Sequence, residues 1–282
     1  MSPNSNPRIV NKPRAVPYAM SVAVQRRWLT AAAAVLALAG AVGRADAALS
    51  AEEGLARDPD NDRLLYREAH LIRRDGERPV ERLVLYRCPN GVAFARKRVD
   101  YRDSALAPAF EMVDIRGYRE GLRREGGRVL LWAGTAPAKA LKPARATTPL
   151  VADAGFDEFL RQHWAPLAAG QAQPLAFAVP AYGRSLALKV RSGGVHAQGS
   201  ERLKRFELRL DGLLGAVAPS IRVEYDADDR RLRRFLGPTN IRDARGKQIE
   251  ADIRFPRPPQ AADNARWQAA LSEPLARCAL GG

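Results

Sequence analysis

Residues 203–210 read Leu-Lys-Arg-Phe-Glu-Leu-Arg-Leu, and apolar and charged side chains alternate along them. In an extended chain Phe206, Leu208 and Leu210 share one face with Lys204, while charged residues occupy the odd-numbered positions from 205 to 209. This period of two is typical of a strand with one buried face and one exposed face. It argues against a parallel α/β sheet, whose strands are buried on both faces.

Similar runs recur along the chain, separated by turn signals such as Asp75-Gly76 and Pro89-Asn90-Gly91. They cover residues 65–72, 80–88, 92–101, 110–116, 119–124, 128–133, 175–179, 185–191, 221–225, 231–236 and 247–255. We therefore predict a mainly β fold, either a curved antiparallel sheet or an open half-barrel of about eleven strands around a central helix, with a C-terminal helix. The predicted boundaries are a linker over 48–61, a single β-rich half-barrel domain over 62–255 and a tail with a short helix over 256–282.

The central helix is expected over 154–165, where Phe156, Phe159 and Trp164 fall at helical spacing. Asp153 is placed to serve as its N-cap. Because its aromatic face must be buried, we expect this helix to fill the concave side of the sheet and to cover apolar surface until a ligand binds.

The N-terminal 47 residues have the pattern of a secretory signal. Arg26-Arg27-Trp28 precedes an apolar run over 29–43, and Ala45-Asp46-Ala47 follows it as a small-residue cleavage site. The run is shorter than the roughly 20 residues that span a membrane. We predict cleavage after Ala47, a periplasmic location and no integral membrane span in the mature chain. The choices between Met1 and Met20 as the start, and between general and twin-arginine export, stay open.

Basic residues outnumber acidic ones, 46 Lys and Arg against 31 Asp and Glu. Beyond residue 47 the counts are forty and thirty, a net charge of +10 that is spread along the chain. An Arg-rich surface suits carboxylate and phosphate partners such as an anionic envelope component. Export argues against nucleic acid as the partner. The alternative is that a GC-rich genome supplies the Arg and Ala.

Cys88 and Cys278 are the two cysteines of the chain. In an exported protein an even and sparse count favours one disulfide. Such a bond would close a very long loop and stabilise the fold by roughly 4–5 kcal/mol in the chain-entropy model. Two separate buried thiols are the alternative. Neither cysteine lies in a Cys-x-x-Cys motif, which argues against redox catalysis.

No catalytic or metal motif stands out, so we predict no metal, no cofactor and no catalysis. Gly183-Arg184-Ser185-Leu186-Ala187 lacks the last Gly of a nucleophile elbow, and we interpret Ser185 as a strand residue. His70 is expected to pair with Glu68 or with a cross-strand partner. The segment 237–243, Gly-Pro-Thr-Asn-Ile-Arg-Asp, is interpreted as a strand-connecting turn, with a polar contact at the mouth of a cavity as the alternative.

Three segments resemble uncharacterised exported bacterial proteins: residues 65–70 (Leu-Tyr-Arg-Glu-Ala-His), residues 86–97 (Tyr-Arg-Cys-Pro-Asn-Gly to Phe-Ala-Arg-Lys) and residues 237–241 (Gly-Pro-Thr-Asn-Ile). The strand count with an enclosed helix is similar to the half-barrel of the periplasmic lipoprotein-carrier-like superfamily. That resemblance covers roughly residues 62–255. It implies a concave apolar surface for acyl chains and no catalysis.

The function expected from these observations is binding of a lipid or other amphiphilic envelope component in a concave β-sheet. The inward-facing side chains expected to contact this ligand are Phe94, Trp132, Phe177, Phe206, Leu208, Ile249 and Ile253. An envelope scaffold or partner-binding subunit is the first alternative, and an esterase or glycan-active enzyme built from scattered residues is the second. The sequence leaves the oligomeric state open.

Overall fold

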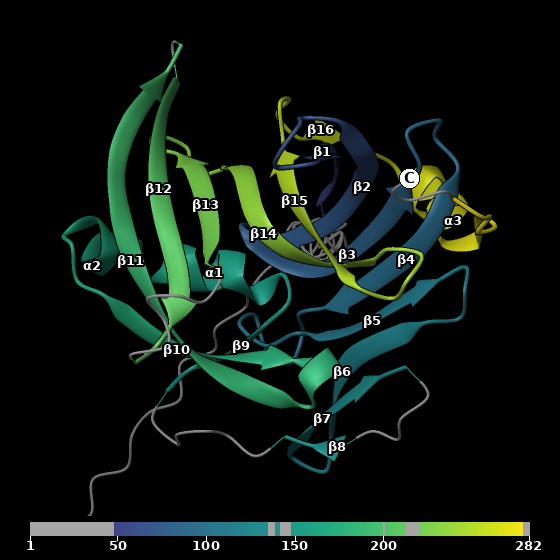
Figure 1. Cartoon of the computed structure of the whole chain (residues 1–282), viewed down its shortest axis with the longest axis horizontal. Helices are drawn as coiled ribbons and strands as arrows, with labels where there is room; N and C mark the ends of the chain where they lie inside the picture. Colours follow the sequence, from purple (N-terminus) through teal and green to yellow (C-terminus); the bar gives the residue numbers. More distant parts are fainter. Residues whose placement is uncertain (1–47, 135–138, 142–147, 200, 213–219, 279–282) are drawn as a thin grey trace, which may run out of the picture. The chain divides into compact units, whose positions relative to one another are not determined.

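One hydrogen-bonded sheet organises the computed structural model, as Figure 1 shows. The structure describes residues 48–134, 139–141, 148–199, 201–212 and 220–278, all within one compact unit over Asp46–Gly282. The predicted signal segment 1–47 lies outside the described residues. Among the described helices none is both long and apolar enough to cross a membrane.

Within the described residues the sheet contains sixteen strands and is accompanied by three α-helices and one 3₁₀ turn. The first eight strands are β1 Ala48–Arg57, β2 Leu64–Asp75, β3 Arg78–Arg87, β4 Ala93–Asp100, β5 Ala109–Asp114, β6 Arg119–Glu125, β7 Arg128–Ala133 and β8 Lys139–Ala140. The others are β9 Leu150–Ala152, β10 Gln173–Val179, β11 Arg184–Gln198, β12 Glu201–Leu210, β13 Ile221–Asp226, β14 Leu232–Arg242, β15 Gln248–Arg254 and β16 Gln260–Ala261. The helical elements are α1 Gly155–Gln162, α2 Trp164–Ala168, η1 Pro180–Tyr182 and α3 Asn264–Ser272.

The strand order explains how the chain builds one sheet. It begins with β1 in the middle, runs outward strand by strand to β8 at one end, and restarts with β9 at the other end. From there it returns inward until β15 pairs with β1, with Leu55 opposite Arg254. Neighbouring strands are antiparallel apart from the β9–β10 pair. The predicted mainly β, curved antiparallel sheet is therefore confirmed.

The two ends of the strand order approach each other through side chains. Residues Ala152 of β9 and Ala178 of β10 share a buried cluster with Phe110, Leu122 and Leu131 of β5 to β7. The 3₁₀ turn η1, which follows β10, contacts β6 and β7. The sheet thus curls round and encloses an interior, and among the described strands no backbone ladder joins its two ends.

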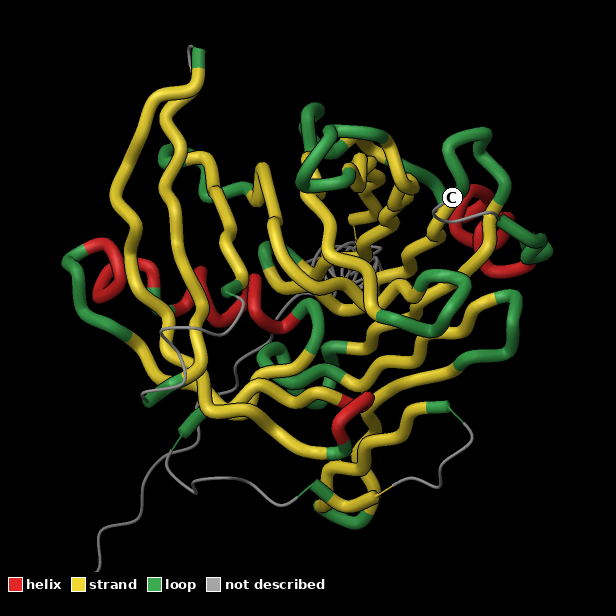
Figure 2. Tube along the Cα trace, viewed as in Figure 1, coloured by secondary structure: helices red, strands yellow, loops and turns green. Residues whose placement is uncertain are grey.

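Helices α1 and α2, which are among the red segments of Figure 2, share a buried cluster with inward residues of β11 to β13. They replace the single helix predicted over 154–165. Pro166 explains the break, because it has no N–H to donate to Gln162 and its ring would clash with that carbonyl. A second difference concerns the N-cap. Asp153 was predicted to cap the helix, but the N-cap of α1 is Ala154, which makes no side-chain hydrogen bond.

The C-terminal segment covers the outer face of β2 to β4. Trp267 of α3 is 5% exposed and packs in one cluster with Leu83 and Leu85 of β3. Beyond the helix the predicted disulfide between Cys88 and Cys278 is present, with 5.9 Å between the two Cα atoms. A disulfide fits an oxidising compartment.

Two expectations from the sequence were wrong. Residues 48–57, predicted as part of a linker, form the central strand β1, in which the buried residues are Ala51, Gly54 and Ala56. Gly54 shows why they are small, because a Cβ at this position would lie 2.9 Å from the ring of Phe255. The expected count of about eleven strands is also too low, since β1 and the short strands β8, β9 and β16 carry no clear alternation.

The outer face of β12 to β15 carries a ladder of ion pairs. Arg205 donates to Glu224, and both Arg234 and Arg254 donate to Asp252, at distances of 2.6–2.9 Å. Burial acts to raise the pKa of Asp252, but its hydrogen bonds from the two arginines outweigh burial and hold that pKa below its usual value. The charged face predicted from the alternating pattern is thus a bonded network.

Candidate functional site

The inner face of the sheet lines a cavity of about 1010 Å³. Its walls come from β2 to β6, from β10 to β15 and from α1, so both halves of the strand order contribute to one space. Sites that hold drug-sized molecules have volumes of roughly 300–1,000 Å³. The cavity therefore has room for one medium-sized organic molecule.

One side of the cavity is apolar. It is formed by α1 and strands β10 to β14, with the side chains Phe156, Phe177, Leu186, Leu188, Leu208, Leu210, Ile221, Leu232 and Phe235. Phe156 of the helix packs on Phe235 of β14, with 5.8 Å between the ring centroids. A ligand would gain mainly hydrophobic burial on this side.

The other side of the cavity is polar and is formed by β2, β3, β4, β6 and the loop before α1. Its ionisable side chains are Glu68, His70, Arg82, Lys97, Glu120 and Asp153. The alternation of β3 explains one of them, because Leu83 and Leu85 point outward against α3 while Arg82 and Tyr86 line the cavity. The two sides together give the cavity an amphipathic lining.

A buried ion pair stands at the centre of the polar side. Lys97 Nζ donates to Asp153 Oδ1 at 2.8 Å and to the amide oxygen of Asn240 at 3.5 Å. The Lys97 side chain is 10% exposed and the Asp153 side chain 3%. The other carboxylate oxygen of Asp153, Oδ2, is buried with no hydrogen-bond partner. Asp153 also has a left-handed backbone, with φ at 45°, a conformation that Asp tolerates better than most residues.

Glu68 and His70 form a second pair on the same face of β2. Glu68 Oε2 lies 2.8 Å from His70 Nε2, and both residues are buried. The edge of the His70 ring meets Phe255, with 5.6 Å between the centroids. The predicted pairing of His70 with Glu68 is confirmed.

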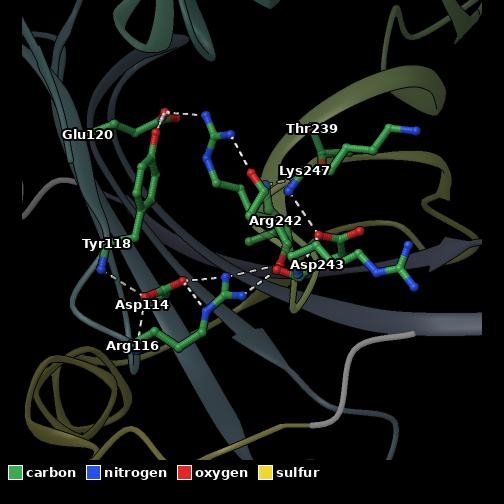
Figure 3. A network of polar contacts seen from close by, with 11 residues as sticks. Asp114, Arg116, Tyr118, Glu120, Thr239, Arg242, Asp243 and Lys247 are labelled. Carbon is green, nitrogen blue, oxygen red and sulfur yellow. Dashed lines mark hydrogen bonds and ion pairs between the residues drawn. The ribbon is translucent and has the colours of Figure 1, made fainter. Parts of the chain in front are cut away.

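Glu120 connects the polar side to β14, as Figure 3 shows. Its carboxylate accepts hydrogen bonds from the Tyr118 hydroxyl at 2.7 Å and from the Asn240 amide, and it lies 4.0 Å from Arg242. Burial and the adjacent Glu120 charge raise the pKa of Tyr118. The segment 237–243, interpreted from the sequence as a turn, instead continues β14 up to Arg242 and lines the cavity with Asn240.

The β5–β6 turn is fastened to the β14–β15 turn just outside this cluster. Asp114 accepts hydrogen bonds from the side chain of Arg116, and Arg116 also donates to the carbonyl oxygens of Arg242 and Asp243 (Figure 3). The guanidinium of Arg242 lies over the Tyr118 ring, 4.6 Å from its centroid. These contacts hold together two hairpins that are far apart in the strand order.

Arg82 differs from the other charged residues of the polar side. In the described part of the chain it makes no hydrogen bond or ion pair, and its Nε is buried without a partner. Its nearest aromatic contact is Tyr101, whose ring centroid lies 6.0 Å away. Burial raises the pKa of Tyr101 to about 12, although the charge of Arg82 acts in the opposite direction. Burial acts to lower the pKa of Arg82, but Tyr101 and the surrounding carboxylates, Asp157 first, raise it overall.

The ligand-contacting residues expected from the sequence fall in two places. Phe177, Leu208 and Ile253 line the cavity. The other four are absent from its described lining. Phe94 and Phe206 are buried in two different core clusters, and Ile249 packs against the cluster that contains Phe94. Trp132 lies under Arg123 and against Gly121. Phe206 is withdrawn from the cavity because Trp164 of α2 covers it, 5.1 Å between the ring centroids.

The sequence analysis missed the charged residues of the site, although a signal for them exists. Lys97 is on the inward face of β4, between the buried apolar residues Ala95 and Val99 of the same face. Arg82 is likewise on the inward face of β3, two residues before the buried Val84. A charged residue on the otherwise apolar face of a strand is costly unless it is paired or functional. The alternating pattern therefore identifies Lys97 and Arg82 as unusual, but it does not identify the residues that contact them.

Other candidate chemistry from the sequence lies elsewhere. Ser185 is in β11, paired with Ala178, as predicted for a strand residue. Within the described ranges, no group of three or more His, Cys, Asp and Glu side chains is placed to hold a metal ion.

Comparison with known proteins gives little to add to this geometry. No family model matches the chain, and no curated protein matches it. Among solved structures, it is similar to a β-barrel-like protein of a domain of unknown function, DUF1849, from Brucella abortus, at 11% identity and a TM-score of 0.44. The match covers 77% of this chain and 98% of the other. A likeness at this level carries no inference about family or activity.

Proposed function

We propose that this chain is a non-catalytic periplasmic protein that binds a lipid or another amphiphile in its interior cavity. The observation that carries the proposal is the division of the 1010 Å³ cavity into an apolar side from β10 to β14 and a charged side from β2 to β6. A molecule with an acyl or similarly apolar body and a polar end matches both sides at once. A wholly apolar ligand would leave Arg82 Nε and Asp153 Oδ2 on the charged side without a partner.

The periplasmic location rests on two further observations. The disulfide between Cys88 and Cys278 fits an oxidising compartment. The pattern of residues 26–47 is that of a cleavable signal. N-terminal sequencing of the chain recovered from a periplasmic extract tests this part of the proposal, and we expect the first residue to be Ala48. Recovery of the chain in the cytoplasmic fraction with residues 1–47 attached would contradict it.

The first test of binding is native mass spectrometry of the full chain purified from the periplasm, followed by solvent extraction and lipid analysis. We expect a stoichiometric added mass that the extraction identifies as an amphiphile. Chain without added mass that also takes up no lipid from an added envelope extract would refute the proposal. It would favour the scaffold alternative and call for a search for an envelope partner.

The second test locates the binding site. Leu186 lines the apolar side from β11 and is partly exposed to the cavity, so Leu186→Trp adds bulk there. We expect it to weaken binding of a fluorescent apolar probe by about tenfold, since overpacking costs about 1–3 kcal/mol. Val195→Trp is the matched control, because Val195 is 52% exposed near the tip of the β11–β12 hairpin. Equal binding by both variants would place the probe outside the cavity.

A further inference from the structure

The unpaired guanidinium of Arg82 is unusual among the partly buried arginines of this chain. Arg231, Arg233 and Arg242 have side chains that are 13–18% exposed, and each has a carboxylate within 4.0 Å. Arg82 lines the cavity and has no such partner among the described residues. A largely desolvated guanidinium that donates no hydrogen bond is costly, and a directly paired arrangement is the rule.

Asp153 and Asp157, two of the carboxylates whose charge acts on Arg82, each accept a hydrogen bond from another donor through Oδ1. Asp153 accepts from Lys97 at 2.8 Å. Asp157 of α1 accepts from the Tyr225 hydroxyl at 2.9 Å and from Arg161 at 3.2 Å. The donors of Arg82 make no hydrogen bond to the described residues and stay available to a molecule in the cavity, while the surrounding carboxylates favour the charged form of Arg82.

We propose that Arg82 binds the anionic head group of the amphiphile, a carboxylate or a phosphate, at the polar side of the cavity. This inference rests on the proposed function and specifies the class of ligand. The planar guanidinium suits either group, because its fork of N–H donors forms two parallel hydrogen bonds with two oxygens. The ligand body then extends toward the apolar side formed by β10 to β14.

Three ligands with the same chain and different ends test the inference on the full-length protein freed of bound lipid. Decanoate carries a carboxylate, decyl phosphate carries a phosphate, and 1-decanol is neutral. Isothermal titration calorimetry with wild type is expected to show at least about tenfold tighter binding of one or both anions than of 1-decanol, since a hydrogen bond to a charged group contributes on that scale. Which anion binds more tightly distinguishes a fatty acid from a phosphate head group.

The variant Arg82→Met is expected to bind all three ligands within about twofold of each other, with the affinity for 1-decanol unchanged from wild type. Arg98→Met is the matched control, because Arg98 is exposed on the outer face of β4 and makes no described ion pair. It should keep the preference for anions.

The results that would contradict the role of Arg82 differ from those that would contradict the proposed function. Equal binding of the three ligands by wild type would overturn the role of Arg82 and leave the proposed function intact. Binding of none of them would overturn both. If Arg82→Met fails to fold, the Nε–H resonance of Arg82 in ¹⁵N-labelled wild type, assigned with Arg82→Lys, gives the answer. It should shift with an anion and not with 1-decanol, and an unmoved resonance would refute the inference.

Discussion

Replacing Lys97 by Met should destabilise the protein by about 3–5 kcal/mol, the cost of leaving one member of a buried ion pair without its partner. The structure supports the upper part of this range. Asp153 is only 3% exposed, its Oδ1 depends on Lys97 at 2.8 Å, and its Oδ2 already has no partner. Met also has nothing to donate to Asn240, which Lys97 contacts at 3.5 Å.

Urea unfolding followed by tryptophan fluorescence measures this loss as a drop in the free energy of unfolding. Arg98→Met, one residue further along β4 and exposed, should change that energy by less than about 0.5 kcal/mol. Adding Asp153→Asn to Lys97→Met should recover part of the loss, because it removes the unpaired charge. A cost below about 1 kcal/mol for Lys97→Met would show that Asp153 is solvated and that the polar side is open to bulk water.

Three more predictions concern the frame around the cavity. Converting Cys88 and Cys278 to Ala should lower the free energy of unfolding by roughly 5 kcal/mol in the chain-entropy model, since the bond spans 190 residues, and denaturant titration of the variant tests this. Asp252→Asn should reduce the dependence of the free energy of unfolding on pH below about pH 5. The native pKa of Asp252 lies below its unfolded value, so the stabilisation from its ionised form is present above about pH 4 and is lost as pH falls through the native pKa. Urea titrations at pH 5 and pH 3 measure how much stability each protein loses between the two pH values. Equal losses for Asp252→Asn and wild type would contradict the prediction. Gly155→Ala should cost at least about 1–3 kcal/mol in thermal or urea unfolding, because its Cβ would overlap the backbone carbonyl of Leu106; a neutral effect would mean that the loop moves freely.

The alternating segments were predictable because the information for each strand is local. Residues 203–210 appear within β12, and Phe206 and Leu208 are buried as their spacing indicates. Local pattern fails for β1, whose burial depends on Ala and Gly residues that fit against Phe255. Small residues have no strong hydrophobic signal, so their place in the middle of the sheet is decided by partners about 200 residues away.

The polar side of the cavity could be predicted only as a set of anomalies. Lys97 stands on the apolar face of a predicted strand, which marks it, but its partner Asp153 belongs to a segment that the sequence assigns to a helix cap. The two residues meet because the β9 end of the sheet packs against β4 and β5, strands that are far from β9 in the strand order. In the structure Asp153 accepts a charge-assisted hydrogen bond from Lys97 instead of capping the helix.

The loop from Ala152 to Gly155 joins this closure to the candidate site. Ala152 N–H donates to the carbonyl oxygen of Leu106 at 2.9 Å, and Gly155 packs against the same carbonyl. Asp153, between them, turns inward to Lys97 through its left-handed backbone. Because one short loop both closes the sheet and supplies a charged residue to the cavity, a ligand that binds the polar side also stabilises the closed sheet by mass action. Closure of the sheet and the proposed recognition of a polar end therefore depend on the same loop.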